Sequence, residues 1–228
     1  MTVTPIASIQ NAFQEKFGVP FQSNQTHQKS TIVFEPPFRN PDALRGLADF
    51  SHLWLLWGFS ANRRKTWSPM VRPPRLGGNA RMGVFATRSP VRPNPIGLSS
   101  VRLAGIQLHS EKGPLIHVLG ADLMDKTPIY DIKPYLAFAD SHPEATGGFA
   151  ADPHPRHLQV LFQISETTLK DLPQSLRQDL SEILACDPRP SYHQDPNRRY
   201  GMQYGGYEVK FFVSQGILTV TEIEKKQG

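Results

Sequence analysis

Proline and glycine set the strongest constraint on the fold of this chain. Its 228 residues include 21 Pro and 17 Gly. Both residues destabilise the interior of an α-helix, Pro because it lacks a backbone donor and Gly because it is conformationally free. A bundle of long helices is therefore excluded, and a loop-rich, mostly β architecture is expected. Hydrophobic residues make up 39% of the chain, enough for one large domain or one medium domain with a small companion.

Short apolar segments separated by Pro and Gly turns dominate residues 1–150. Residues 52–59 (HLWLLWGF) form a continuous apolar run of strand length, which predicts a strand buried on both faces. Further strands are expected at 30–35, 81–88, 100–109, 115–119 and 129–135. Strands at this spacing predict a small antiparallel or mixed β-barrel over residues 1–150.

A second, smaller unit is expected over residues 151–228. Residues 139–156 (ADSHPEATGGFAADPHPR) have no hydrophobic periodicity and predict a linker at the boundary. The elements expected after it are a strand at 157–164, an amphipathic helix at 175–186 and a hairpin of 207–213 and 217–223. The fold class is therefore mainly β, with a small non-Rossmann β-barrel followed by a small α+β C-terminal domain.

Several functional classes are excluded by what the sequence lacks. One cysteine, Cys186, cannot build a disulfide framework, and the histidines do not follow metal-site spacings, so no metal is expected. No GxGxxG, P-loop or GxSxG motif is present. The N-terminus has no secretory pattern and the longest apolar run cannot span a bilayer. A cytoplasmic protein without a membrane partner is expected.

Charge is distributed unevenly along the chain. The formal net charge is +5 and the pI is about 9.4. Between Phe50 and Ser110 there is no Asp or Glu. The cations of this stretch are Arg63, Arg64, Lys65, Arg72, Arg75, Arg81, Arg88, Arg92 and Arg102. Ordinary surfaces mix the two signs, so these residues either pair with distant carboxylates or form a phosphate-binding face, which we favour.

Two segments have the composition of RNA-contacting surfaces. In residues 71–97 (VRPPRLGGNARMGVFATRSPVRPNPIG), Pro restricts the backbone, so that Arg side chains are held in a preset geometry for planar anions. In residues 187–200, Arg and Tyr alternate, which suits phosphates and exposed bases. The expected RNA contacts are Arg63, Arg64, Arg72, Arg75, Arg189, Tyr192, Arg198 and Arg199. The alternatives are a solvated Pro-rich loop, and tail tyrosines packed inside the small domain.

The sequence also resembles a known family. MGVFATRSPVRPNPIG at 82–97 and DLMDKTPIYDIKPY at 122–135 are similar to the signature of the TsaA-like family of tRNA methyltransferases. FSHLWLLWGF, RPPRLGGNARMG and DPRPSY at 187–192 match as well, so the resemblance covers about residues 17–225. It implies an S-adenosylmethionine-dependent enzyme with a β-barrel core that methylates N6 of N6-threonylcarbamoyladenosine at position 37 of threonine tRNA. It also implies binding of the tRNA anticodon loop, and a homodimer.

Matching the family's motifs residue by residue implies a cofactor site. Its members are Pro20, Phe21, Gln22, Ser60, Ala61, Arg88, Leu98, Asp122, Leu123, Met124 and Asp125. The chain departs from its relatives at Phe21, where Arg is common, and at Ser60 and Ala61, where His and Gln are common. A carboxylate of the 122–125 turn is suited to the cofactor's ribose hydroxyls or amino group, although turn capping is the alternative for Asp122 and Asp125.

The same match implies the catalytic candidates Arg92, Asn94, Asp131, Lys133 and Tyr135. Methyl transfer needs positioning more than acid–base force, and Asp131, Tyr135 or solvent could accept the N6 proton. Lys133 or Arg92 would grip the threonyl carboxylate or a phosphate, and Asn94 an adenine edge. Alternatively, Asp131 and Lys133 pair with each other and Asn94 holds its own loop.

Two other functions are also compatible with the sequence. Because of the departures at Phe21 and Ser60, the chain could be an RNA-binding barrel without catalysis. It could also be a cofactor-dependent enzyme that acts on a small metabolite, which the acid-free arginine stretch disfavours.

Overall fold

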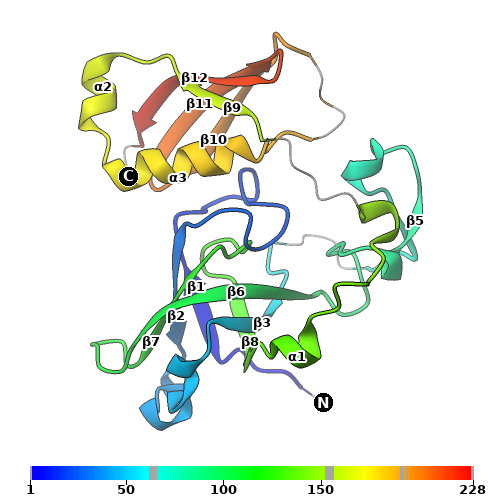
Figure 1. The fold of residues 1–228 in the computed structure, drawn as a ribbon, viewed down its shortest axis with the longest axis vertical. Helices are drawn as coiled ribbons and strands as arrows, with labels where there is room; N and C mark the ends of the chain where they lie inside the picture. The colour runs from blue at the N-terminus through cyan, green and yellow to red at the C-terminus, as the bar shows by residue number, and fades with distance from the viewer. Residues whose placement is uncertain (1, 62–65, 152–156, 191–192, 194, 227–228) are drawn as a thin grey trace.

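The N-terminal part of the chain forms a closed β-barrel (Figure 1). The computed structural model describes residues 2–61, 66–151, 157–190, 193 and 195–226. The barrel strands are β1 (Ala7–Gln10), β2 (Lys29–Phe34), β3 (His52–Gly58), β6 (Ile96–Gln107), β7 (Leu115–Leu119) and β8 (Pro128–Pro134). They close in the order β1-β2-β7-β6-β3-β8, with antiparallel neighbours throughout. The expected barrel is thereby confirmed.

Strand β3 is buried on one face, not on both as its apolar run predicted. Leu53, Leu55 and Trp57 are buried and alternate with partly exposed residues. An antiparallel barrel directs only alternate residues to its core. The outward Trp54 is partly covered, because its Nε1 donates to Oδ2 of Asp140 at 2.9 Å.

The acid-free stretch, which runs from Phe50 to Ser110, forms less β-sheet than the sequence predicted. The strand predicted at 81–88 is reduced to β5 (Met82–Gly83), which pairs with β4 (Met70–Val71). A 3-10 helix follows directly at Val84–Ala86. Other 3-10 helices lie at Pro36–Phe38, Pro41–Leu44, Leu47–Asp49, Pro74–Leu76 and Gly148–Ala150, and α1 is Ala137–Asp140. Prolines begin several of these turns, because a proline at the first helical position loses no hydrogen bond.

The C-terminal part is a four-stranded sheet covered by helices, as the α+β expectation required. Its elements are β9 (Gln159–Phe162), α2 (Glu166–Asp171), α3 (Gln174–Ala185), β10 (Arg199–Tyr204), β11 (Tyr207–Ser214) and β12 (Ile217–Lys225). The strand order is β10-β11-β12-β9. Helix α3 begins after Pro173 and buries Leu176, Leu180, Ile183 and Leu184. Strand β10 was not expected, because its sequence was interpreted as an RNA-contacting tail.

The segment between β1 and β2, residues 11–28, belongs to both parts of the molecule. We call it the β1–β2 connection. Figure 1 shows it extending from the barrel towards α3. Phe13 is 1% exposed and lies in the core of the C-terminal sheet, where Phe17 and Val19 also pack. This connection therefore joins the barrel core to the C-terminal core, and it comes before most of the barrel strands in the sequence.

No helix in the described ranges has the length and apolar character required to cross a membrane. The His, Cys, Asp and Glu side chains of the same ranges form no group of three that could hold a metal ion.

Candidate functional site

A cavity of about 550 Å³ lies beside the barrel and is the candidate functional site. We call it the barrel cavity. Cavities of this size suit small ligands and cofactors. Its wall includes the predicted residues Pro20, Phe21, Gln22, Ser60, Ala61, Arg88, Arg92, Leu98, Asp122, Leu123 and Met124. The structure therefore brings together nearly the whole predicted cofactor set, from segments far apart in the sequence.

Trp57 and Gly97 form one wall of the barrel cavity. They face each other in the register of β3 and β6. A Cβ atom on Gly97 would lie 2.3 Å from Cε2 of Trp57, so only glycine leaves room for the indole ring. The indole is fixed at its polar end as well, because Trp57 Nε1 donates to Ser99 Oγ at 2.9 Å.

Asp122 supplies the carboxylate of the barrel cavity. Its Oδ1 accepts a hydrogen bond of 2.6 Å from Ser99 Oγ. Burial raises the pKa of Asp122 above its ordinary value, while the Ser99 bond and the nearby Arg88 oppose that rise. No other carboxylate lines this cavity among the residues that the structure describes. Asp122 is therefore the natural acceptor for hydroxyl or amino donors of a ligand.

Arg88 and Phe21 also line the barrel cavity. Arg88 Nη1 donates to Gln22 Oε1, which ties the loop after β5 to the β1–β2 connection. Phe21 is 49% exposed and presents an aromatic ring to the cavity. Ser60 and Ala61 also line it. This part of the cavity wall is therefore formed by one aromatic and two small side chains.

Asp125 and Arg92 both form hydrogen bonds with the protein's own backbone. Asp125 does not line the barrel cavity; its Oδ1 accepts from the backbone N of Asn11 at 3.1 Å. Arg92 lines the cavity, but its Nη1 donates to the carbonyl oxygen of Thr87 at 3.0 Å. The guanidinium of Arg92 therefore braces its own loop.

Asp131, Lys133 and Tyr135 lie beside the barrel cavity but do not line it. Lys133 Nζ is 2.8 Å from Oδ2 of Asp131 on β8, so the two side chains pair with each other. Leu56 stands opposite both Asp131 on β8 and Leu98 on β6, which places these side chains in one row on the outer face.

Aromatic rings extend this outer face along β3. The ring of Tyr135 lies 5.6 Å from that of Trp54, between ring centroids, and Trp54 lines the cavity. Asn94 is exposed in the loop before β6 and does not line the cavity; its carbonyl oxygen accepts from Ile96 N at 2.7 Å. Of the predicted catalytic set, Arg92 alone lines the cavity, and the other four residues are not part of its wall.

The predicted RNA contacts fall into three groups. Arg63, Arg64 and Tyr192 lie outside the described residues. Arg72 and Arg75 form no ion pair within the described ranges, and Arg198 and Arg199 are exposed on and beside β10. Arg199 also lies 4.2 Å above the ring of Phe212.

Arg189 differs from the other predicted RNA contacts because it is buried. Its Nε lies 2.7 Å from Oδ1 of Asp187, and its Nη2 lies 2.9 Å from Oδ2. Only 8% of Arg189 is exposed, and the hydrogen bond to Asp187 raises the pKa of Arg189. Its guanidinium is already used inside the C-terminal part and does not face solvent phosphate.

Sequence reasoning missed the buried polar pair Trp57 and Ser99. A signal exists in the sequence, because Ser99 stands at an inward position of β6, between the inward Gly97 and Val101. An inward hydroxyl needs a partner, and Asp122 is that partner.

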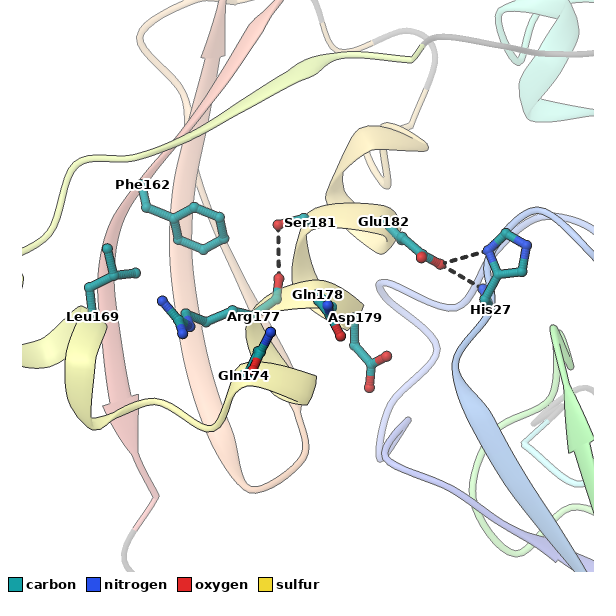
Figure 2. A pocket seen from close by; sticks show the side chains of 9 residues that line it. All are labelled: His27, Phe162, Leu169, Gln174, Arg177, Gln178, Asp179, Ser181 and Glu182. Carbon is teal, nitrogen blue, oxygen red and sulfur yellow. Dashed lines mark hydrogen bonds and ion pairs between the residues drawn. The ribbon is translucent and has the colours of Figure 1, made fainter.

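A second cavity of about 790 Å³ lies on the C-terminal part, beside α3 (Figure 2). Figure 2 shows the Arg177 side chain directed between Phe162 and Gln174, and Glu182 directed towards His27. Asp179 Oδ2 accepts a 2.8 Å bond from the hydroxyl of Tyr204, so this carboxylate is engaged. None of the predicted residues lines this cavity, and the barrel cavity remains the candidate site.

Comparison with known proteins agrees with the sequence signature. The model of the tRNA-methyltransferase O N-terminal domain matches residues 8–141, and that of the TrmO C-terminal domain matches residues 152–226. A tRNA (adenine(37)-N6)-methyltransferase from Escherichia coli is 40% identical over 97% of both chains. A Pseudomonas aeruginosa protein, provisionally named an S-adenosylmethionine-dependent methyltransferase, is 41% identical over 91% of this chain and 90% of its own.

Solved structures give the same result for the fold. A crystal structure of TrmO from Pseudomonas aeruginosa has a TM-score of 0.78 and 34% sequence identity, and the match covers 99% of this chain and 97% of that chain. The two family models together span both the barrel and the C-terminal sheet. This chain belongs to the tRNA-methyltransferase O family.

Proposed function

We propose that this protein is an S-adenosylmethionine-dependent tRNA methyltransferase that methylates N6 of adenosine 37, with N6-threonylcarbamoyladenosine in threonine tRNA as the modified base. The observation that carries the proposal is the barrel cavity, whose wall gathers Phe21, Arg88, Leu98 and Asp122 from four separate segments. The full-length relative named tRNA (adenine(37)-N6)-methyltransferase supports the reaction.

The wall of the barrel cavity fits the chemical groups of S-adenosylmethionine. Asp122 offers a carboxylate for ribose hydroxyls or for the cationic amino group, as an acceptor of charge-assisted hydrogen bonds. Phe21 and Trp57 offer rings against which an adenine can pack. This fit requires no dinucleotide-type fold, which agrees with the missing GxGxxG motif.

The bound cofactor supplies a methyl group on a cationic sulfur. The task of the protein is to hold the N6 acceptor in line with that bond, since positioning contributes most to such a displacement. Lys133, which is largely exposed beside Asp131, is placed to bind the threonyl carboxylate. Asp131 and Tyr135 are the proposed acceptors of the N6 proton, and they would act on a base that reaches the cavity across the outer face of β3 and β8.

The tRNA would be held by arginines that form no ion pair within the described residues. Arg72 and Arg75 lie in the acid-free stretch, and Arg198 and Arg199 lie at the start of β10. Phe85, which is 75% exposed, stands within the acid-free stretch and can stack on an unpaired base. The anticodon loop is single-stranded, so it offers both phosphates and bases to this surface.

We also propose that the protein is a cytoplasmic homodimer. Leu98 is 55% exposed and Ile96 is 41% exposed on β6, next to the barrel cavity. A second copy that covers these side chains would bury them and would narrow the cavity. Light scattering on the purified protein tests this, and a monomer at micromolar concentration would contradict it.

Mass spectrometry of tRNA nucleosides tests the proposed function. Deletion of the gene should remove the N6-methylated form of N6-threonylcarbamoyladenosine, and expression of the wild-type chain should restore it. An unchanged nucleoside profile would favour one of the two alternatives, a non-catalytic RNA-binding barrel or an enzyme acting on a small metabolite. Binding of S-adenosylmethionine then separates these two, because only the metabolite enzyme needs it.

A further inference from the structure

We infer that the C-terminal part holds the cofactor-binding segment in place, so that Phe17, which does not line the barrel cavity, is a positioning residue for S-adenosylmethionine. The inference rests on the proposed function, because it requires the cofactor to occupy the barrel cavity. It concerns the β1–β2 connection, residues 11–28, whose middle residues Pro20, Phe21 and Gln22 line that cavity.

The first limb of the connection is fixed to the C-terminal sheet at successive points. The ring of Phe13 meets that of Tyr204 edge-on, with centroids 5.1 Å apart. The carbonyl oxygen of Ala12 accepts from Gly205 N at 3.0 Å, and Oε1 of Glu15 accepts from Gln203 N at 2.8 Å. This limb therefore lies against the C-terminal part along its length.

The contacts with the C-terminal sheet continue as far as Val19, a residue of the cavity wall. The ring of Phe17 stacks on those of Tyr200 and Phe211, at centroid distances of 6.4 and 6.3 Å. Gly18 has a φ of +95°, and a Cβ atom there would lie 2.6 Å from Sδ of Met202 on β10. Val19 packs on the same core and also lines the barrel cavity.

The second limb is fixed as well. His27 donates from its backbone N to Oε2 of Glu182 on α3 at 2.7 Å, a contact drawn in Figure 2. Cys186, at the end of the same helix, donates from Sγ to the carbonyl oxygen of Gln25 at 3.6 Å. Gln28 Nε2 then donates to the carbonyl oxygen of Ala121 at 2.8 Å, directly before Asp122. Contacts with the rest of the protein thus hold the cofactor-binding segment, residues 20–22, on both its N-terminal and its C-terminal side.

This arrangement has an energetic consequence for ligand binding. The middle of the connection has no strand or helix of its own, and Phe21 is half exposed. If the contacts with the C-terminal part were lost, these residues would be less ordered in the free protein. Cofactor binding would then have to order them. Fixing one residue costs about 1–2 kcal/mol, so loss of a single anchor should weaken S-adenosylmethionine about 5- to 30-fold.

Calorimetric titration with S-adenosylmethionine tests the inference on the full-length protein. Phe17→Ala should weaken the dissociation constant about 5- to 30-fold, and Phe17→Leu should restore part of it. In steady state, Phe17→Ala should raise KM for S-adenosylmethionine while kcat and KM for tRNA stay near wild type. That split distinguishes positioning of the cofactor segment from a general loss of folded protein.

A matched control is Leu218→Ala. Leu218 is buried in the same core on β12, which β11 separates from β10. It should lower the melting temperature but leave cofactor affinity within about twofold of wild type, when measured well below its melting temperature. An equal loss of affinity in Leu218→Ala and Phe17→Ala would overturn the positioning role.

Asp122→Asn separates a failure of this inference from a failure of the proposed site. If Asp122→Asn weakens S-adenosylmethionine but Phe17→Ala does not, the cavity is retained and the positioning role is wrong. If Asp122→Asn leaves binding unchanged, the proposed cofactor site itself is wrong. Where Phe17→Ala does not fold, Phe17→Leu decides, and wild-type affinity in that variant overturns the inference.

Discussion

Ser99 donates a 2.6 Å hydrogen bond from its Oγ to Oδ1 of Asp122 and joins the barrel core to the cavity wall. Ser99 is buried on β6, whereas Asp122 follows β7, at the edge of the barrel cavity. The bond fixes the carboxylate at the wall of the cavity, and a backbone hydrogen bond from Ser23 also stabilises its charged form. Burial raises the pKa of Asp122, so the protein holds this charge at some cost to its own stability.

Asp122→Asn should weaken cofactor binding without destabilising the fold. The amide keeps an oxygen that can accept from Ser99, but it loses the charge that a ligand donor would meet. Loss of one charge-assisted bond of about 1.5–3 kcal/mol corresponds to about 10- to 150-fold in affinity. Calorimetry and a melting curve on the same preparation measure both quantities. A clear fall in melting temperature would contradict the account of Asp122 as a destabilising charge.

The pH dependence of stability should carry the signature of Asp122. Because its pKa is raised on folding, the native state binds more protons than the unfolded state in the window above the ordinary value of 3.8. Stability of the wild type relative to Asp122→Asn should therefore fall as pH rises through this window, and should level off above the raised pKa. Urea unfolding of both proteins across acidic pH measures this difference in stability. A rise of the difference with pH would contradict a raised pKa of Asp122.

Gly97→Ala should damage the barrel cavity through Trp57. The added Cβ would lie 2.3 Å from Cε2 of Trp57, so the indole must move from the wall. Overpacking of this kind costs about 1–3 kcal/mol, and the displaced ring would no longer support an adenine. Gly83→Ala is a matched control, because a Cβ there meets no atom within 4 Å. Equal cofactor affinity in the two variants would show that Trp57 does not shape the site.

Affinity for tRNA should depend steeply on salt through the arginines of the acid-free stretch. Each phosphate contact with single-stranded RNA contributes about −0.7 to the slope of log affinity against log salt concentration. Replacing Arg72 and Arg75 by Ser should flatten that slope. Arg45→Ser is the control, because Arg45 Nη2 already pairs with Asp42 Oδ1 at 2.7 Å. A double variant with the wild-type slope would remove these two residues from the RNA surface.

The elements that the sequence predicted well are those with a local signal. Leu115–Leu119 and the 217–223 strand have alternating apolar residues between turn residues, and they form β7 and the core of β12. Residues 175–186 carry a leucine stripe and Pro173 before them, and α3 begins at Gln174. The long family motifs also predicted half of the residues that line the barrel cavity, because they cover contiguous loops.

The parts that could not be predicted depend on contacts between residues far apart in the chain. Asp125 was expected to face a cofactor, but it accepts from Asn11, more than a hundred positions away. Phe13 lies in a core formed by β10 and β11. No pattern within a window of a few residues records such pairings.

The reaction of the purified protein with its proposed substrates tests the central claim most directly. Wild-type protein would be incubated with isotopically labelled S-adenosylmethionine and threonine tRNA that carries N6-threonylcarbamoyladenosine, and the nucleosides then separated by mass spectrometry. The account predicts one labelled methyl group on that base, and little transfer by Asp122→Asn. Absence of label in the modified nucleoside, with intact protein and tRNA, would contradict it.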